Sequence, residues 1–297
     1  MGTLKNVFDD VFRDALKKGS IGKIETTISE HNVYQQGSAQ LLPFLDRIVQ
    51  SLILPGSGVD GMENLEELLD KAQAGKSCIL LLEHYSNLDL SLFSWLVRQA
   101  GERGEEIDKA LVSIAGMKLN EESPIVATMA SAYTRLVIYP SRSVENLDPE
   151  KSRAEILRSN AINRAAMKAL LELKTQGKII LVFPSGTRYR PWDPSTKKGV
   201  REIDSYIRSF DYMCCVALNG EVLHVHQGDM LEDSVSQDLV RITAGKVVSC
   251  AEFREQARAA AEAAGIEDKK QAAVDAVMVE LEKMHLAAEE KRRRFLG

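Results

Sequence analysis

The residues from Glu83 to Asp89, Glu-His-Tyr-Ser-Asn-Leu-Asp, have types and a spacing that suit acid–base chemistry. If the loop folds back onto the first turn of a following helix, His84 can meet the carboxylate of Asp89. That carboxylate would hold the imidazole in one tautomer and leave the other ring nitrogen to take a proton from a substrate hydroxyl. In the simpler interpretation, Asp89 is a helix N-terminal charge favoured by the dipole and His84 is a surface residue. The pair alone is therefore weak evidence.

A second candidate segment, Pro184 to Pro191, reads Pro-Ser-Gly-Thr-Arg-Tyr-Arg-Pro. Alternate residues of an extended backbone point the same way, so Arg188 and Arg190 can converge on one anion. Two guanidinium groups suit a phosphate better than a single carboxylate. A glycine lets the backbone approach closely and can form an anion-binding nest with its neighbours. The residues that shape this turn are Ser185, Gly186 and Thr187. A surface turn with solvated arginines is the alternative.

Each candidate segment follows a short apolar run, and such runs alternate with longer helical patterns from residue 77 onward. This alternation predicts an α/β fold with a mixed sheet covered by helices on both faces. The expected strands are Ser77–Leu82, Ala110–Ala115, Leu136–Tyr139, Lys178–Phe183, Tyr212–Leu218 and Leu239–Val248. Because loops at the carboxyl ends of strands carry ligands in open α/β sheets, both segments are placed where a site is expected.

Helices are expected on either side of this region. The first 75 residues are helical in pattern, including a repeat of Ile21, Ile24 and Ile28, and we expect a small N-terminal helical domain over residues 1–55 and an α/β domain over 56–297. A long helix is expected from Pro149 to Gln176, and Gly265 divides the C-terminal tail into two helices.

Composition excludes several classes of protein. The 297 residues are 44% hydrophobic and 27% charged with a formal net charge of -5, so the overall field does not attract nucleic acid. No apolar stretch approaches the roughly 20 residues that span a bilayer. The four cysteines have no metal-ligand spacing, and we expect buried reduced thiols. The spacing of His224 and His226 could bind a metal from one face of a strand, but no third ligand lies at a suitable spacing. We therefore expect a structural or surface role for both, and no metal.

Together the two segments resemble the glycerolipid acyltransferases, in which a His-x4-Asp loop is followed about a hundred residues later by Phe-Pro-x-Gly-Thr-Arg. The closer likeness, over roughly residues 60 to 250, is to the soluble glycerol-3-phosphate acyltransferase of plant chloroplasts, whose second motif reads Pro-Ser-Gly-Gly-Arg-x-Arg-Pro followed by Asp-Pro-Ser-Thr. The present chain departs from the family at Glu83, where the family has Asn. Ser185 favours the soluble branch, since lysophosphatidate acyltransferases carry Glu there, whereas Thr187 matches the lysophosphatidate branch.

The resemblance implies that His84 is the general base and Asp89 its orienting partner. It implies that Arg188 and Arg190 bind the acceptor phosphate together with Lys118 and Arg142, the latter standing near the position of a family lysine. The implied reaction transfers a fatty acyl group from an acyl-carrier-protein or coenzyme A thioester to the sn-1 hydroxyl of glycerol 3-phosphate, with no cofactor.

Alternatives stay open. The acceptor can instead be lysophosphatidate, or the chain can be a non-catalytic lipid- or carrier-binding module. A serine hydrolase is disfavoured because no Gly-x-Ser-x-Gly elbow follows a strand. We expect a cytoplasmic or stroma-like location, and the basic C-terminus Lys291–Arg294 is a candidate contact for anionic lipid or for an acidic carrier, beside the simpler interpretation of a solvated helix end.

Overall fold

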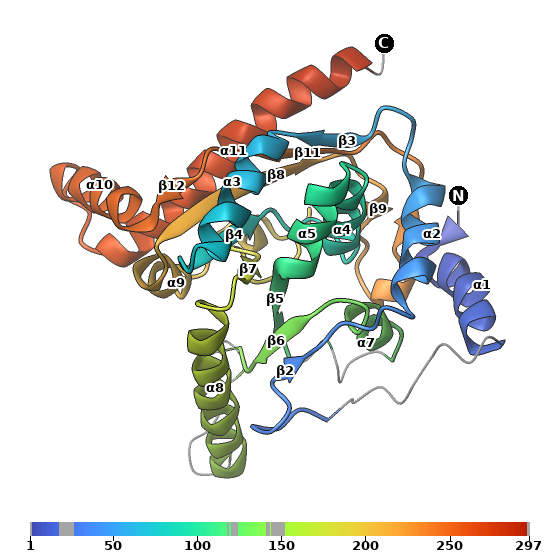
Figure 1. Cartoon of the computed structure of the whole chain (residues 1–297), viewed down its shortest axis with the longest axis horizontal. Coiled ribbons are helices and arrows are strands. Elements are labelled where there is room, and N and C mark those ends of the chain that lie inside the picture. Colours follow the sequence, from blue (N-terminus) through green and yellow to red (C-terminus); the bar gives the residue numbers. More distant parts are fainter. Residues whose placement is uncertain are drawn as a thin grey trace.

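The computed structural model describes residues 2–17, 27–117, 119, 124–140, 143 and 152–295 (Figure 1). Its strands are β1 (Gly2–Thr3), β2 (Tyr34–Gln35), β3 (Gly58–Asp60), β4 (Cys78–Leu82), β5 (Leu111–Gly116), β6 (Arg135–Ile138), β7 (Ile179–Val182), β8 (Tyr212–Asn219), β9 (Leu223–His224), β10 (Ser234–Val235), β11 (Arg241–Ala244) and β12 (Val248–Ser249). Its helices are α1 (Leu4–Lys17), α2 (Leu42–Leu52), α3 (Met62–Gln73), α4 (Asp89–Arg98), α5 (Glu102–Ala110), α7 (Pro124–Ala130), α8 (Arg153–Leu173), α9 (Ile203–Ser209), α10 (Cys250–Ala263) and α11 (Lys269–Phe295).

The main sheet is mixed, as predicted. Its order is β2-β6-β5-β7-β4-β8-β11-β3, with β12 also paired to β8. The five central strands from β6 to β8 are parallel, whereas β2 and β11 join them antiparallel. A separate antiparallel sheet joins β1, β10 and β9. The carboxyl ends of the central strands therefore meet at one edge, where sites form in α/β folds.

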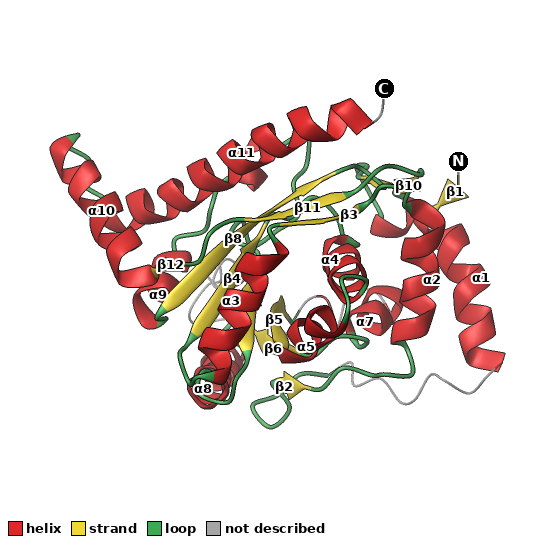
Figure 2. Cartoon of the chain, turned by 45° about the horizontal axis from the view of Figure 1, so that its top comes forward, coloured by secondary structure: helices red, strands yellow, loops and turns green. Residues whose placement is uncertain are grey.

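Helices cover both faces of the main sheet (Figure 2). The run Cys78–Leu82 is wholly buried, which is typical of a parallel strand covered on both sides. Leu80 lies in a hydrophobic cluster with residues of α2, α3, α4 and α5, whereas its neighbour Ile79 lies in a second cluster with residues of α8, α9 and α11. Alternate side chains of the strand thus pack into two hydrophobic cores, one on each face of the sheet. The predicted fold class is confirmed.

The N-terminal helices share the first of these cores. Leu4 and Phe8 of α1 and Leu45 of α2 belong to the cluster that contains Leu80. The expected helical repeat at Ile21 and Ile24 lies outside the described residues, and residues 27–41 are not helical, because the short strand β2 pairs with β6 there. The domain boundary near residue 55 stays a prediction.

Most predicted elements from residue 77 onward are present with shifts of a few residues at their ends. The predicted strand Leu239–Val248 is wrong as a single element: β11 and β12 pair with different parts of β8. The long helix is shorter than predicted, Arg153–Leu173, and Gly265 separates α10 from α11 with a left-handed φ of 69°. In the described part of the chain no helix is long and apolar enough to cross a membrane.

All four cysteines are buried and free, as predicted; they are Cys78, Cys214, Cys215 and Cys250. Burial raises the pKa of the Cys78, Cys215 and Cys250 thiols to about 12. These thiols are therefore poor nucleophiles, and the chemistry of the chain lies elsewhere.

Candidate active site

Two loops far apart in the sequence meet at the carboxyl edge of the main sheet. β4 and β7 are adjacent and parallel, with Leu81 opposite Val182, so the loops that follow them begin side by side. The ring of His84 stacks on that of Phe183, with 4.0 Å between centroids, and the N–H of Tyr189 donates a 2.9 Å hydrogen bond to the carbonyl oxygen of His84. The sheet register therefore brings together the two segments that the sequence places a hundred residues apart.

His84 and Asp89 form the expected pair. The distance from His84 Nδ1 to Asp89 Oδ2 is 2.9 Å, and the Asp89 side chain is only 1% exposed. Asp89 is the first residue of α4, and three further hydrogen bonds hold it. Its Oδ2 accepts from the N–H groups of Tyr85 (2.6 Å) and Ser86 (2.8 Å), and its Oδ1 accepts from the Ser86 hydroxyl (2.7 Å). The loop thus wraps around a fixed carboxylate.

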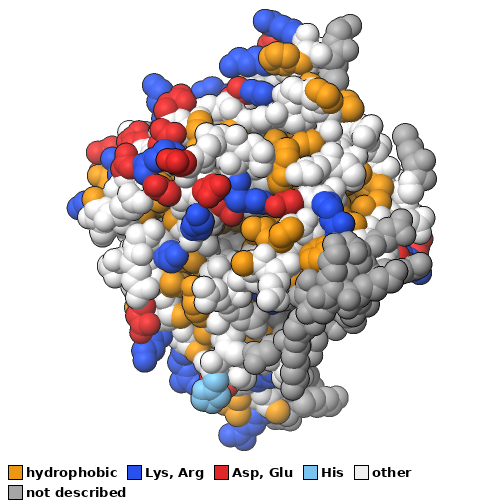
Figure 3. All heavy atoms as spheres, turned by 45° about the vertical axis from the view of Figure 1, so that its right-hand side comes forward, with side chains coloured by type: hydrophobic (Ala, Val, Ile, Leu, Met, Phe, Trp, Pro, Cys, Tyr) orange, Lys and Arg blue, Asp and Glu red, His pale blue; other side chains and the backbone are white. Residues whose placement is uncertain are grey.

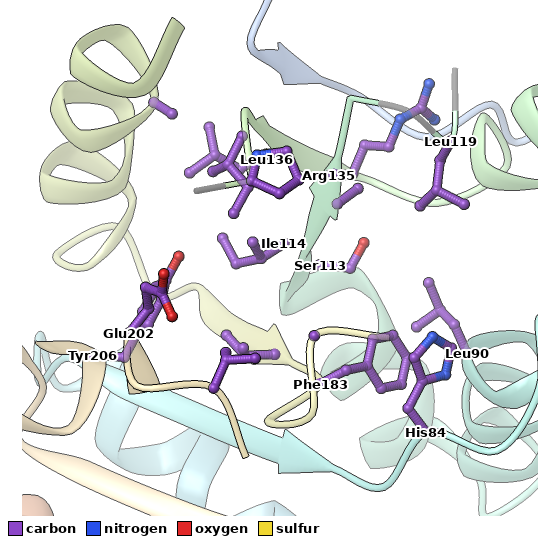
Figure 4. A pocket seen from close by; sticks show the side chains of 18 of the residues that line it. His84, Leu90, Ser113, Ile114, Leu119, Arg135, Leu136, Phe183, Glu202 and Tyr206 are labelled. Atoms are coloured by element: carbon purple, nitrogen blue, oxygen red, sulfur yellow. The ribbon is translucent and has the colours of Figure 1, made fainter. Parts of the chain in front are cut away.

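This arrangement fixes the imidazole for proton transfer. Because Nδ1 faces an acceptor-only carboxylate, it carries the proton, and Nε2 is left as the basic nitrogen. Stacking on Phe183 holds the ring plane, and the imidazole lines the main cavity (Figure 4). A substrate hydroxyl that reaches Nε2 from the cavity can lose its proton there.

The cavity beside His84 has a volume of about 620 Å³ and a mostly apolar lining. Its walls come from α4, β5, α7, β6, α8, β7 and α9, and its apolar residues include Leu90, Ile114, Val126, Met129, Leu136, Ile138, Ala166, Leu170, Val182, Phe183 and Ile203. Such a space suits a hydrocarbon chain whose reactive end lies at His84. The sequence contains these residues only as strand and helix positions, so the cavity itself is a product of packing.

Arg135 is a polar lining residue that the sequence analysis missed. Its side chain comes from the start of β6 and is 3% exposed, and among the described residues its Nε and Nη1 atoms have no hydrogen-bond partner. Burial lowers the pKa of its guanidinium to about 10. Figure 4 shows Arg135 and Leu119 across the cavity from His84. In the sequence, Arg135 stands in an ordinary strand pattern that carries no signal of a site.

The turn after β7 shapes the cavity wall. The Gly186 N–H donates to the Phe183 carbonyl (2.9 Å) and Gly186 has a φ of 62°, so an L side chain there would be strained. The hydroxyl of the buried Ser185 donates to the Thr187 carbonyl (2.7 Å). Gly186 lines the cavity together with His84, so the predicted turn does lie beside the predicted base.

Arg188 and Arg190 have different surroundings. Arg188 Nη1 forms an ion pair with Asp233, whose side chain is 0% exposed. Oδ1 of the same carboxylate accepts from the N–H of His226 (2.8 Å). The structure shows no side-chain hydrogen bond or ion pair of Arg190 within the described residues, and its N–H donates to the Thr196 hydroxyl (2.9 Å). A joint phosphate-binding role stays a prediction. Of the two arginines, only Arg190 has a guanidinium that pairs with no carboxylate of the described residues. Lys118 and Arg142 lie outside the described residues.

This contrast predicts a loss of stability for an Arg188 variant. Arg188→Met leaves the Asp233 carboxylate buried without its partner, which is expected to lower the free energy of unfolding by about 3–5 kcal/mol in urea titrations. Arg201→Met, which breaks the exposed pair with Asp268, is the control and is expected to cost much less. A stable Arg188→Met variant with a raised KM for a phosphorylated acceptor would instead make Arg188 a substrate ligand.

Glu83, the residue that departs from the resembled family, is buried behind the loop. Its Oε2 accepts from the Leu218 N–H and from His285 Nδ1, both at 2.9 Å, and its Oε1 accepts from the Tyr85 hydroxyl (3.1 Å). The structure therefore pairs Glu83 with a basic neighbour, His285.

His224 and His226 take part in local contacts. His224 Nε2 lies 2.7 Å from the Ser236 hydroxyl, and His226 Nδ1 lies 2.8 Å from the His224 carbonyl oxygen. Both contacts hold the β9–β10 region together.

Comparison with known protein families agrees with this site. Residues 58–231, more than half of the chain, match the Acyltransferase family. The chain therefore belongs to the acyltransferase family, and the matched region contains both loops and the His84–Asp89 pair. No curated protein sequence matches the chain significantly.

Proposed function

We propose that the chain transfers a fatty acyl group from an acyl-carrier-protein or coenzyme A thioester to the sn-1 hydroxyl of glycerol 3-phosphate, giving lysophosphatidate. The observation that carries the proposal is the His84–Asp89 pair at one end of a large apolar cavity, beside the turn Ser185–Thr187. An acyl chain fills the cavity and the acceptor approaches from the side of the turn.

The reaction needs one base and no covalent enzyme intermediate. His84 Nε2 takes the hydroxyl proton while the oxygen attacks the thioester carbonyl carbon. The tetrahedral intermediate collapses, the carbon–sulfur bond breaks, and the imidazolium returns its proton to the leaving thiolate. Asp89 stabilises the imidazolium that forms between the two steps.

The acceptor phosphate needs a cation near the turn. Arg190 supports this part of the proposal because its guanidinium is uncommitted within the described residues, in contrast to Arg188. Arg135, whose Nε and Nη1 have no hydrogen-bond partner among the described residues, offers a second cation to any polar or anionic group that enters the cavity more deeply. Ser185, which stands where lysophosphatidate acyltransferases carry Glu, favours glycerol 3-phosphate as the acceptor.

Arg190→Gln is expected to raise the KM for glycerol 3-phosphate about tenfold to a hundredfold, the effect of losing one charge-assisted hydrogen bond, with little change in kcat. Steady-state kinetics at saturating acyl donor measures this. Arg164→Gln, on the exposed side of α8, is the control. An unchanged KM for Arg190→Gln would remove this residue from the acceptor site.

The experiment that tests the proposed function is palmitoyl transfer from its carrier-protein and coenzyme A thioesters, with glycerol 3-phosphate and lysophosphatidate as competing acceptors and no membrane present. Formation of lysophosphatidate supports the proposal and identifies the donor. Transfer only to lysophosphatidate, the acceptor of the family branch that Thr187 matches, would show that lysophosphatidate is the acceptor in place of glycerol 3-phosphate. No transfer to either acceptor would favour a binding module.

The C-terminal contact for a carrier protein or lipid headgroups is also a proposal. Its arginines are largely balanced by acidic neighbours: Arg292 pairs with Asp238 and Glu289, Arg293 with Glu289, and Arg294 with Glu290. Figure 3 shows basic and acidic side chains interspersed on the surface that it displays. This balance weakens the attraction to an anionic surface. Because salt screens the attraction that remains, the contact is expected to be strongest at low ionic strength.

A further inference from the structure

The loop of residues 83–89, which carries His84, contacts the C-terminal helix α11. Glu83 immediately precedes His84 and is 6% exposed, so its carboxylate depends on protein partners in place of water. Of its three hydrogen-bond donors, the backbone N–H of Leu218 and the hydroxyl of Tyr85 are neutral. His285 is the only basic side chain that pairs with it among the described residues.

His285 is suited to hold this carboxylate. Its Nδ1 lies 2.9 Å from Glu83 Oε2 and 3.3 Å from the Tyr85 hydroxyl. Burial lowers the pKa of His285, but the hydrogen bond and negative charge of Glu83 outweigh it, so the pKa is raised above 6.5. Lys197 and Glu282 also face the imidazole, with opposite effects on its pKa. The imidazole therefore favours the charged form that a buried carboxylate requires.

Three further sets of contacts anchor α11, the helix that carries His285. Val274, Val277 and Leu281 of α11 are buried in the second core. On the loop side of the helix, Asn219 Nδ2 donates to the His285 carbonyl (3.0 Å), which sets the height of α11 against β8. Glu282, one turn before His285, pairs with Lys197 from the segment after β7.

The contacts continue from α11 to the second loop. The Tyr85 ring lies 5.4 Å from the His285 ring and meets the Tyr189 ring edge-on at 6.1 Å. The Tyr189 N–H in turn donates to the His84 carbonyl. His285 is thus connected to the backbone of His84 by two routes, one through Glu83 alone and the other through Tyr85 and Tyr189.

We propose that His285 is a positioning residue for His84, acting through Glu83 and Tyr85, and that α11 completes the active site although it lies outside the region that matches the family. The proposal rests on acyl transfer at His84. Without a donor at position 285, the Glu83 carboxylate loses one of its three hydrogen bonds in a buried site, and the loop shifts to hydrate it. A shift of about 1 Å in a catalytic group can lower turnover about a hundredfold.

The test compares His285→Leu with His285→Asn in the full-length chain. His285→Leu is expected to lower kcat about tenfold to a hundredfold with the KM values of donor and acceptor within about twofold of wild type. In His285→Asn the amide Nδ2 takes the place of the ring Nδ1, and kcat is expected to recover most of this loss. The double variant Glu83→Gln/His285→Leu is expected to be less impaired than the product of the single effects, since the unpaired carboxylate is gone.

Leu281→Ala is the control for helix docking. Leu281 is buried one turn before His285, so the substitution weakens the docking of α11 without touching Glu83. At a temperature well below both unfolding midpoints, Leu281→Ala is expected to keep its kcat. If Leu281→Ala and His285→Leu lower kcat equally at equal loss of stability, His285 acts only by anchoring the helix and the proposal is overturned.

NMR of the imidazole nitrogens tests the positioning role of His285 independently of the proposed acyl transfer. The chain has five histidines, which makes assignment tractable. In wild type, His84 is expected to show a single tautomer with the proton on Nδ1, and His285→Leu is expected to broaden or mix that signal. An unchanged His84 signal would overturn the positioning role, whatever acceptor the enzyme proves to use.

The pH dependence of stability tests whether His285 and Glu83 form an ion pair. Because the pKa of His285 is raised on folding, its contribution is fully present below pH 6.5 and is lost as the pH rises through the folded-state pKa. The difference in unfolding midpoint between wild type and His285→Asn is expected to shrink over that interval. A difference that grows with pH would contradict an ion pair with Glu83.

Discussion

His84→Ala is expected to reduce the rate of acyl transfer about 10²- to 10⁴-fold, the contribution of a positioned general base. Nε2 of His84 is the basic nitrogen in the cavity beside the expected position of the thioester, because Nδ1 is held 2.9 Å from Asp89. Alanine removes the base and leaves the walls of the cavity, so binding of the acyl donor is expected to persist. Single-turnover measurements with a radiolabelled acyl thioester separate binding from chemistry.

Two comparisons make the His84 result specific. The thermal unfolding midpoint of His84→Ala is expected to stay near that of wild type, since the imidazole is partly exposed at 17% and Asp89 keeps its three hydrogen bonds from Tyr85 and Ser86. His31→Ala removes an imidazole that is 86% exposed and is expected to leave the rate unchanged. Retained turnover in His84→Ala would show that another group takes the proton.

Asp89→Asn is expected to have a comparable effect on turnover and an additional effect on stability. An amide in place of the carboxylate presents an NH₂ group to the His84 ring or to the loop N–H groups, so the imidazole loses its orienting acceptor; a similar change in a serine protease lowers kcat about 10⁴-fold. The N–H groups of Tyr85 and Ser86 both donate to Oδ2, so they lose their acceptor where the amide nitrogen takes that position. A buried donor left unsatisfied costs about 1–3 kcal/mol, which urea titration detects.

Asp229→Asn is the matched control for Asp89→Asn. Asp229 is likewise a carboxylate that accepts a backbone hydrogen bond, from the Leu231 N–H at 2.9 Å, but it is exposed and belongs to neither loop. It is expected to change neither turnover nor unfolding appreciably. If Asp89→Asn loses stability and keeps its kcat, Asp89 serves the loop alone and another group orients His84.

The role proposed for His285 gives a reason for the departure at Glu83. A buried carboxylate next to the general base would repel an anionic acceptor if it faced the cavity. In the structure it faces away, toward Leu218 and His285, where a basic side chain pairs with it. The acidic residue is therefore compatible with a phosphorylated substrate, and its presence goes together with the histidine on α11.

The sequence by itself determined the central strands and the two loops. Runs such as Cys78–Leu82 and Ile179–Val182 are apolar at every position because both faces are buried, so they can be identified without knowing their partners. His84, Asp89 and the turn at Gly186 follow such runs directly, and their order along the chain already places them at one edge of a parallel sheet. Local spacing was enough for these features.

Tertiary structure decided the remainder, because each of these features joins residues that carry no local signal of one another. The strands β2 and β9 are two residues long and exist only through their pairing partners. The ion pair of Arg188 spans 45 positions and that of Glu83 with His285 spans 202, so neither the reduced availability of Arg188 nor the support from α11 follows from spacing. The cavity likewise depends on how seven elements pack, which only the folded chain fixes.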